Sequence, residues 1–80
     1  MKRIRSVAMV FNHVRFGNDI LARRLELGLS GEQVAEIVEF EKSTIYKYER
    51  ATEPSPKMRH FLAICNAYDL DPREYFELER

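Results

Sequence analysis

The chain has 80 residues, enough for one small domain and too few for the separate hydrophobic cores of a multidomain enzyme. Hydrophobic residues at 45% and charged residues at 32% are proportions typical of a folded globular protein, which argues against disorder. The 13 basic and 13 acidic side chains cancel, so net charge gives no argument for binding nucleic acid. Residues 1–30 nevertheless hold six basic against two acidic side chains, which leaves room for one basic face.

Residues with special chemistry are few, and they predict a protein without an active site. The single cysteine, Cys65, cannot form an internal disulfide, and no charged-then-apolar leader is present, so we expect a reduced, cytoplasmic protein. No apolar run approaches the roughly 18 residues of a membrane span. His13 and His60 lack a further histidine or cysteine at metal-ligand spacing. We therefore expect no catalysis, metal, cofactor or small-molecule substrate, and a buried, inert Cys65 thiol.

The first 15 residues fit two kinds of structure. Val7, Met9 and Phe11 alternate as in a β-strand, whereas Val7, Val10, Phe11 and Val14 are spaced as on one face of a helix. The spacing alone does not decide between a strand and a helix.

Two helices are predicted next. A helix over about 14–27 follows from an apolar stripe within one half of a helical wheel, and Gly28 is a natural stop for it. The stripe consists of Phe16, Ile20, Leu21, Leu25 and Leu27. Ser30 followed by Gln33 has the spacing of a capping box and predicts the start of a second helix, of about two turns.

Three more helices complete the prediction. A short helix lies between Val38 and Ala51, after a three-residue turn. Ser55–Pro56 and Asp71–Pro72 each combine a capping side chain with a first-turn proline, which predicts two further helices. The last of them carries Tyr75, Phe76 and Leu78, which either close the core or pair with a second copy. The whole chain from Phe16 onward is therefore expected to be all-α.

The third helix carries the residues that suggest a function. Lys42, Ser43, Tyr46, Lys47 and Arg50 share one arc of its wheel, opposite Thr44, Ile45 and Tyr48. Lysine can donate to guanine or phosphate, serine to a base edge, and tyrosine to phosphate, so this face suits a DNA major groove. The alternative is that these polar side chains are simply solvated.

These elements together form a helix-turn-helix, and the sequence resembles the Cro/CI-type (Xre-like) repressor family. The matching segments are Leu27–Ser30, Ala35, Ser43–Ile45, Lys47–Arg50, Ile64–Pro72 and Tyr75–Phe76. The resemblance implies a five-helix, lambda-repressor-like domain over residues 16–80, preceded by an N-terminal extension, residues 1–15. It also implies sequence-specific binding of double-stranded DNA by a small transcription regulator, a repressor, acting as a homodimer.

The residues expected to contact DNA follow from this arrangement. Base contacts are expected from Lys42, Ser43, Tyr46 and Lys47. Phosphate contacts are expected from Ser30, Gly31, Arg50, Lys57 and Arg24, and from Lys2, Arg3 and Arg5 if the extension is an arm on DNA. The apolar residues of the extension favour a dimer contact instead, and we leave both roles open.

Arg24 lies near the middle of the apolar arc of the first helix. An unpaired charge there would cost several kcal/mol, so it requires a carboxylate partner. The family resemblance implies that this partner is Glu49, at the end of the third helix.

Three departures from the family pattern bear on function. Glu39 and Ala51 stand where many members have glycine, so a left-handed backbone at either site would cost about 1 kcal/mol or more. Gly31 stands where glutamine is frequent, which removes a side-chain phosphate contact. Glu39 and Glu41 would approach the DNA phosphates. The alternative function is therefore a protein-interaction module or antitoxin-like partner with a degenerate helix-turn-helix that does not bind DNA.

Overall fold

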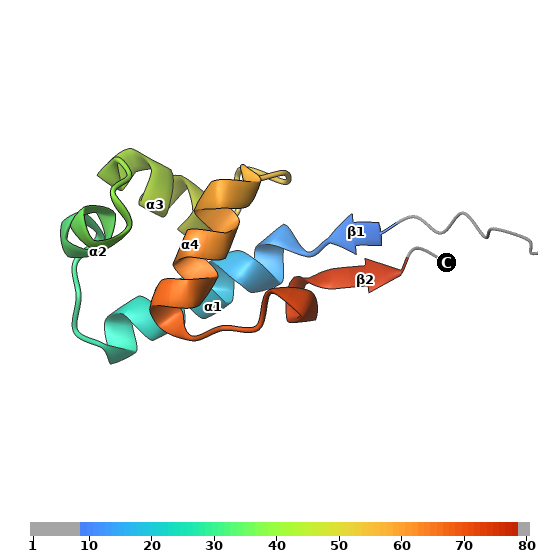
Figure 1. Ribbon diagram of the computed structural model, residues 1–80, viewed down its shortest axis with the longest axis horizontal. Coiled ribbons are helices and arrows are strands. Elements are labelled where there is room, and N and C mark those ends of the chain that lie inside the picture. The colour runs from blue at the N-terminus through green and yellow to red at the C-terminus, as the bar shows by residue number, and fades with distance from the viewer. Residues whose placement is uncertain (1–8, 79–80) are drawn as a thin grey trace, which may run out of the picture.

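Residues 9–78, the part of the chain that the computed structural model describes, form four α-helices and a two-stranded ribbon (Figure 1). The order is β1 (Met9–Phe11), α1 (His13–Glu26), α2 (Gly31–Val38), α3 (Lys42–Glu49), α4 (Met58–Tyr68), a 3₁₀ turn η1 (Pro72–Tyr75) and β2 (Phe76–Leu78). The helices pack together at one end, and the antiparallel β1–β2 ribbon extends from the other. No helix in the described residues is both long and apolar enough to span a membrane.

The helix-turn-helix unit forms as its start and stop signals predict. Gly28 adopts the left-handed conformation, with φ 69°, directly after α1 ends. The Ser30 hydroxyl accepts a hydrogen bond from the Gln33 amide at 3.1 Å, and the Gln33 side chain accepts one from the Ser30 amide at 2.8 Å. This reciprocal pair satisfies two amides that the first turn of α2 would otherwise leave free, so the predicted capping box is confirmed.

The expectation of an all-α fold with five helices is wrong at the C-terminus. The Asp71 side chain accepts from the Arg73 amide, and Pro72 follows it as in a helix start, but η1 ends after one turn. Phe76 then pairs with Phe11 in the ribbon, with their ring centroids 5.3 Å apart. A further helical turn would break this pairing, so a contact across 65 positions of sequence overrides the local helix signal.

The two ends of the chain therefore combine in one small sheet. In the described part of the N-terminal segment, the strand alternative is confirmed, because Met9 and Phe11 lie in β1. The Asn12 amide donates to the Tyr75 carbonyl at 2.7 Å, and the Asn12 side chain caps α1. Residues 9–15 are thus built into the fold, whereas Val7 lies outside the described residues.

The start of α4 also differs from the prediction. Lys57 is the N-cap, without a side-chain hydrogen bond, and Ser55–Pro56 lies in the loop before it. Pro56 lines a small apolar depression together with Phe11 and Phe61. The proline thus lines this depression at the base of the ribbon instead of opening the helix.

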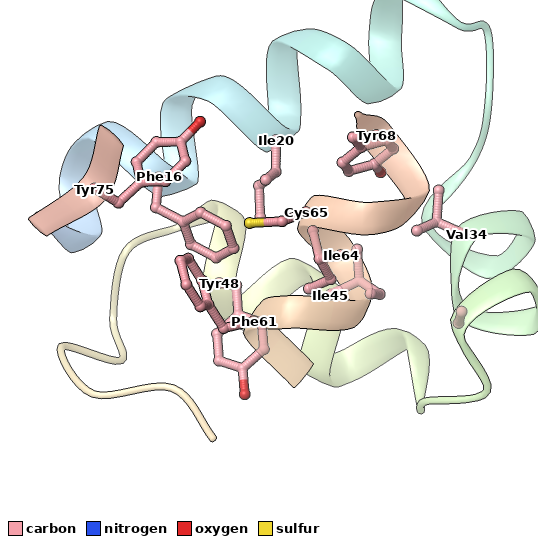
Figure 2. Packing of buried hydrophobic residues seen from close by; sticks show 11 residues of the cluster. Phe16, Ile20, Val34, Ile45, Tyr48, Phe61, Ile64, Cys65, Tyr68 and Tyr75 are labelled. Carbon is pink, nitrogen blue, oxygen red and sulfur yellow. The ribbon is translucent and has the colours of Figure 1, made fainter. Parts of the chain in front are cut away.

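The hydrophobic core lies between the four helices (Figure 2). Phe16 and Phe61 meet edge to face with centroids 5.0 Å apart, and Tyr75 is fully buried beside them. Cys65 is also buried, which raises the pKa of its thiol to about 11 and keeps it protonated and inert, as expected. Gly17 allows α1 to approach α3, because a Cβ there would lie 2.6 Å from the Tyr48 carbonyl oxygen.

Backbone strain is present on both sides of α3. Glu39 has φ 61° and Ala51 has φ 57°, the left-handed region in which a residue with a Cβ atom is disfavoured. These are the two positions at which the sequence departs from the family's glycines.

We predict that Glu39→Gly and Ala51→Gly each raise the free energy of unfolding by about 1 kcal/mol, because glycine carries no strain at positive φ. Ala22→Gly, on the exposed surface in the middle of α1, is the control and should lower it by about 1 kcal/mol. Urea unfolding of the three variants measures this. If both turn variants lose stability as Ala22→Gly does, the turns are not strained.

Candidate nucleic-acid interface

The third helix is held by one face and exposes the other. Ile45 and Tyr48 are 1% and 3% exposed and pack in the core, as their positions on the wheel predict. On the outer face, the Lys42 and Lys47 side chains are 63% and 45% exposed, and Ser43 is exposed between them. A helix anchored in this way presents a polar, basic surface in a fixed direction.

The anchor at the end of α3 is an ion pair with α1. The Arg24 guanidinium donates to both carboxylate oxygens of Glu49, at 2.6 and 2.9 Å, and to the Leu29 carbonyl at 3.0 Å. The two side chains are only 12% and 5% exposed. The hydrogen bond to Glu49 raises the pKa of Arg24 despite the opposing effect of burial, so the pair remains charged.

Tyr46 lies on the outer arc of α3, but its ring is directed toward α2. A Cβ atom at Gly31 would lie 2.5 Å from the Tyr46 hydroxyl oxygen and 2.8 Å from ring atom Cε1. The guanidinium of Arg24 lies 5.6 Å from the centre of the same ring, within range of a cation–π contact. Tyr46 therefore lies against the first residue of α2, unlike the lysines on either side of it.

The start of α2 lies beside this surface. The Ser30 hydroxyl accepts the Gln33 amide, and the Ser30 amide donates to the Gln33 side chain. Gly31 is buried, whereas the Glu32 side chain is exposed. The positive end of the helix dipole attracts an anion here, and the Glu32 carboxylate opposes that attraction. Arg50 and Lys57 are exposed at the end of α3 and the start of α4. Lys2, Arg3 and Arg5 lie outside the described residues.

Carboxylates accompany the basic side chains of α3. The Lys42 ammonium is 3.5 Å from a Glu32 carboxylate oxygen, and the Lys47 ammonium is 3.8 Å from one of Glu53. Exposed pairs of this kind are worth about 0–1 kcal/mol, so a phosphate or base can displace the carboxylate at small cost.

Two features that hold the interface were not predicted from the sequence. The Tyr48 hydroxyl and His60 Nδ1 are 2.8 Å apart, and the His60 ring lies 4.1 Å from the Phe40 ring centre, which joins α3 to α4. Burial, and then the nearby cations Arg59 and Lys57, lower the pKa of His60, so the ring is neutral at pH 7. Gly17 supplies the close approach of α1 to α3. Neither feature has a local sequence signal, because each depends on a partner from another helix.

The fold and this surface define a helix-turn-helix protein, and the comparisons with known proteins agree. The helix-turn-helix domain family matches residues 15–78, so the chain belongs to that family, as a member of the Cro/CI type (Xre-like). Among solved structures, it is similar to the restriction-modification controller protein C.AhdI from Aeromonas hydrophila, with 30% identity and a TM-score of 0.67. That match covers 80% of this chain and 96% of C.AhdI. No curated protein matches the chain.

We predict that Arg24→Met or Glu49→Met alone lowers the free energy of unfolding by about 3 kcal/mol, because each leaves a buried charge without its partner. The double variant should lose much less than the sum of the two single losses. Denaturant unfolding of all four proteins gives the coupling between the two sites. A coupling indistinguishable from zero contradicts the prediction.

Proposed function

We propose that the protein is a small transcription regulator that binds a specific sequence of duplex DNA, with α3 in the major groove. The observation that carries the proposal is the arrangement of α3, whose inner face is fixed by Ile45, Tyr48 and the Arg24–Glu49 pair while its basic outer face stays exposed beside the start of α2. Membership of the Cro/CI-type family and the similarity to a controller protein support the same function.

Individual roles follow from position. Lys42 and Ser43 lie in the first turn of α3, the part of a recognition helix that usually meets base edges, and Lys47 continues the same face. We assign these three residues to base contacts. The start of α2 at Ser30 and Gly31, with Arg50 and Lys57, is assigned to the phosphates on either side, because these positions flank α3 and supply the positive end of a helix dipole or a positive side chain. The Ser30 amide itself already donates to the Gln33 side chain.

Arg24 has a weaker case for touching DNA than the exposed cations. Its guanidinium already donates to Glu49 and to the Leu29 carbonyl, and its side chain is only 12% exposed. We therefore propose that Arg24 acts mainly through the structure. Lys2, Arg3 and Arg5 remain candidates for an arm that contacts phosphate.

We further propose that the protein binds DNA as a homodimer, because one short helix reads few base pairs. Met9 and Leu78 are paired in the ribbon and lie on the same face as Phe11 and Phe76. Phe11 and Phe76 pack on the core, whereas Met9 and Leu78 are 55% and 60% exposed. Met58, also 60% exposed, lines the neighbouring apolar depression of about 110 Å³. An uncharged apolar surface of this kind can pack against its own copy about a two-fold axis.

A protein-interaction module is the second candidate function. Glu39 and Glu41 are exposed in the turn just before α3, where their carboxylates would oppose the approach of DNA phosphate. A basic segment of a protein partner would not meet this repulsion.

We predict that Lys42→Ala and Lys47→Ala each cost about 1–3 kcal/mol on the preferred duplex and relax the preference at one base pair. Arg50→Ala or Lys57→Ala should instead weaken all sequences alike and reduce the salt slope by about one. Arg73→Ala, in η1, removes the same charge away from α3 and is the control. The preferred duplex is first selected from random DNA, and binding is then measured over a range of salt concentrations.

The two candidate functions give opposite results in this experiment. If no duplex is enriched, or if Lys42→Ala and Lys47→Ala both bind like the unmodified protein while remaining folded, α3 does not read DNA and the protein-interaction module is favoured.

We also predict that Leu78→Ser shifts self-association to higher protein concentration and makes binding to the selected duplex depend more steeply on concentration. Ile37→Ser, which changes a side chain of similar exposure on α2, should leave self-association unchanged. Sedimentation equilibrium compares the variants. A monomeric unmodified protein at the concentrations that saturate DNA would contradict the homodimer.

A further inference from the structure

The ring of Tyr46 packs against Gly31 and occupies the space that a side chain at position 31 would need. The Tyr46 hydroxyl and ring atom Cε1 would lie 2.5 and 2.8 Å from a Cβ atom at position 31, well inside ordinary van der Waals distance. Gly31 is buried, so the ring covers it. A residue with a Cβ atom can occupy position 31 only if the Tyr46 ring moves away.

The same ring is tied to the turn before α2 through a second residue. The Arg24 guanidinium lies 5.6 Å from the Tyr46 ring centre, donates to the Leu29 carbonyl at 3.0 Å and is fixed by Glu49. Leu29 directly precedes the N-cap of α2. The ring therefore contacts α2 at its first residue and, through Arg24, the segment that leads into it.

A side chain held in this way is poorly placed to contact a base edge. Lys42 and Lys47 keep 63% and 45% of their side chains exposed and pair with the carboxylates of Glu32 and Glu53, whereas Tyr46 is partly buried against a neighbouring helix. Turning Tyr46 outward would uncover Gly31 and give up the contact with Arg24.

We propose that Tyr46 is a positioning residue, whose ring sets the angle between α2 and α3 and so the direction in which Lys42 and Lys47 meet the bases. This inference rests on the proposed DNA-binding function. It replaces the base contact that the helical wheel assigns to Tyr46, and it makes specificity depend on the absence of a side chain at Gly31.

Gly17 provides an informative contrast. A Cβ atom at Gly17 would meet the backbone carbonyls of Tyr48 and Glu49, at 2.6 and 3.0 Å, and backbone cannot turn away. A Cβ atom at Gly31 would meet the far end of one side chain, which can. Gly31→Ala is therefore expected to displace the Tyr46 ring and leave the fold intact, whereas Gly17→Ala strains the packing of α1 on α3.

The test uses Gly31→Ala, Tyr46→Ala, their combination, and Tyr46→Phe, each bound to the selected duplex and to random duplex. Gly31→Ala and Tyr46→Ala should each lower the ratio of selected to random binding by about tenfold, with preference lost across the whole half-site, since several bases are read from one helix. The double variant should be no worse than either single variant. Tyr46→Phe keeps the ring and should bind as the unmodified protein does. Thermal unfolding confirms that each variant is folded.

Other outcomes overturn the inference in recognisable ways. A loss of preference at one base pair in both Tyr46→Ala and Tyr46→Phe would make the hydroxyl a base contact. Additive losses from Gly31→Ala and Tyr46→Ala, or no loss from either, would show that the contact does not orient α3. If the unmodified protein selects no duplex, the proposed function itself fails. In that case, coupling between positions 31 and 46 in unfolding still reports whether they are in contact.

Discussion

The ion pair between Arg24 and Glu49 is the interaction on which the arrangement of the helices depends. It joins α1 to the last turn of α3 and, through the Leu29 carbonyl, to the turn before α2. Apolar side chains of similar volume would stabilise a core at least as well, but they would accept many packing angles. Two hydrogen bonds of 2.6 and 2.9 Å to one carboxylate are compatible with only a narrow range of packing angles. The pair therefore fixes the orientation of α3, which a helix proposed to contact bases would require.

The remaining contacts of α3 also fix its orientation. Tyr48 meets His60 on α4, Gly17 lets α1 approach the end of α3, and Tyr46 covers Gly31 at the start of α2. The turns before and after α3 are held in left-handed conformations at Glu39 and Ala51, despite their cost. An eight-residue helix is only marginally stable by itself, so the orientation of α3 is set by its contacts with α1, α2 and α4.

Local signals in the sequence predict the helix-turn-helix unit well. The features that they miss, such as strand β2, depend on residues distant in the sequence. Gly28 and the capping box at Ser30 depend on groups within four residues, so their spacing is readable. Phe76 begins a strand because Phe11, from the other end of the chain, offers an edge and a ring to pack on. The fit of Tyr46 to Gly31 is equally invisible, since a helical wheel shows which way a side chain leaves its own helix and not what it meets.

The central claim, that α3 and the start of α2 form the DNA-reading surface, is tested most directly by recording backbone amide NMR shifts as selected duplex is added. The account predicts that the largest changes lie in residues 42–47 and at residues 30–31, with small changes in residues 73–78 of η1 and β2. Random duplex should move the same amides less. Changes concentrated in the ribbon or α4, or none on adding the selected duplex, would contradict the claim.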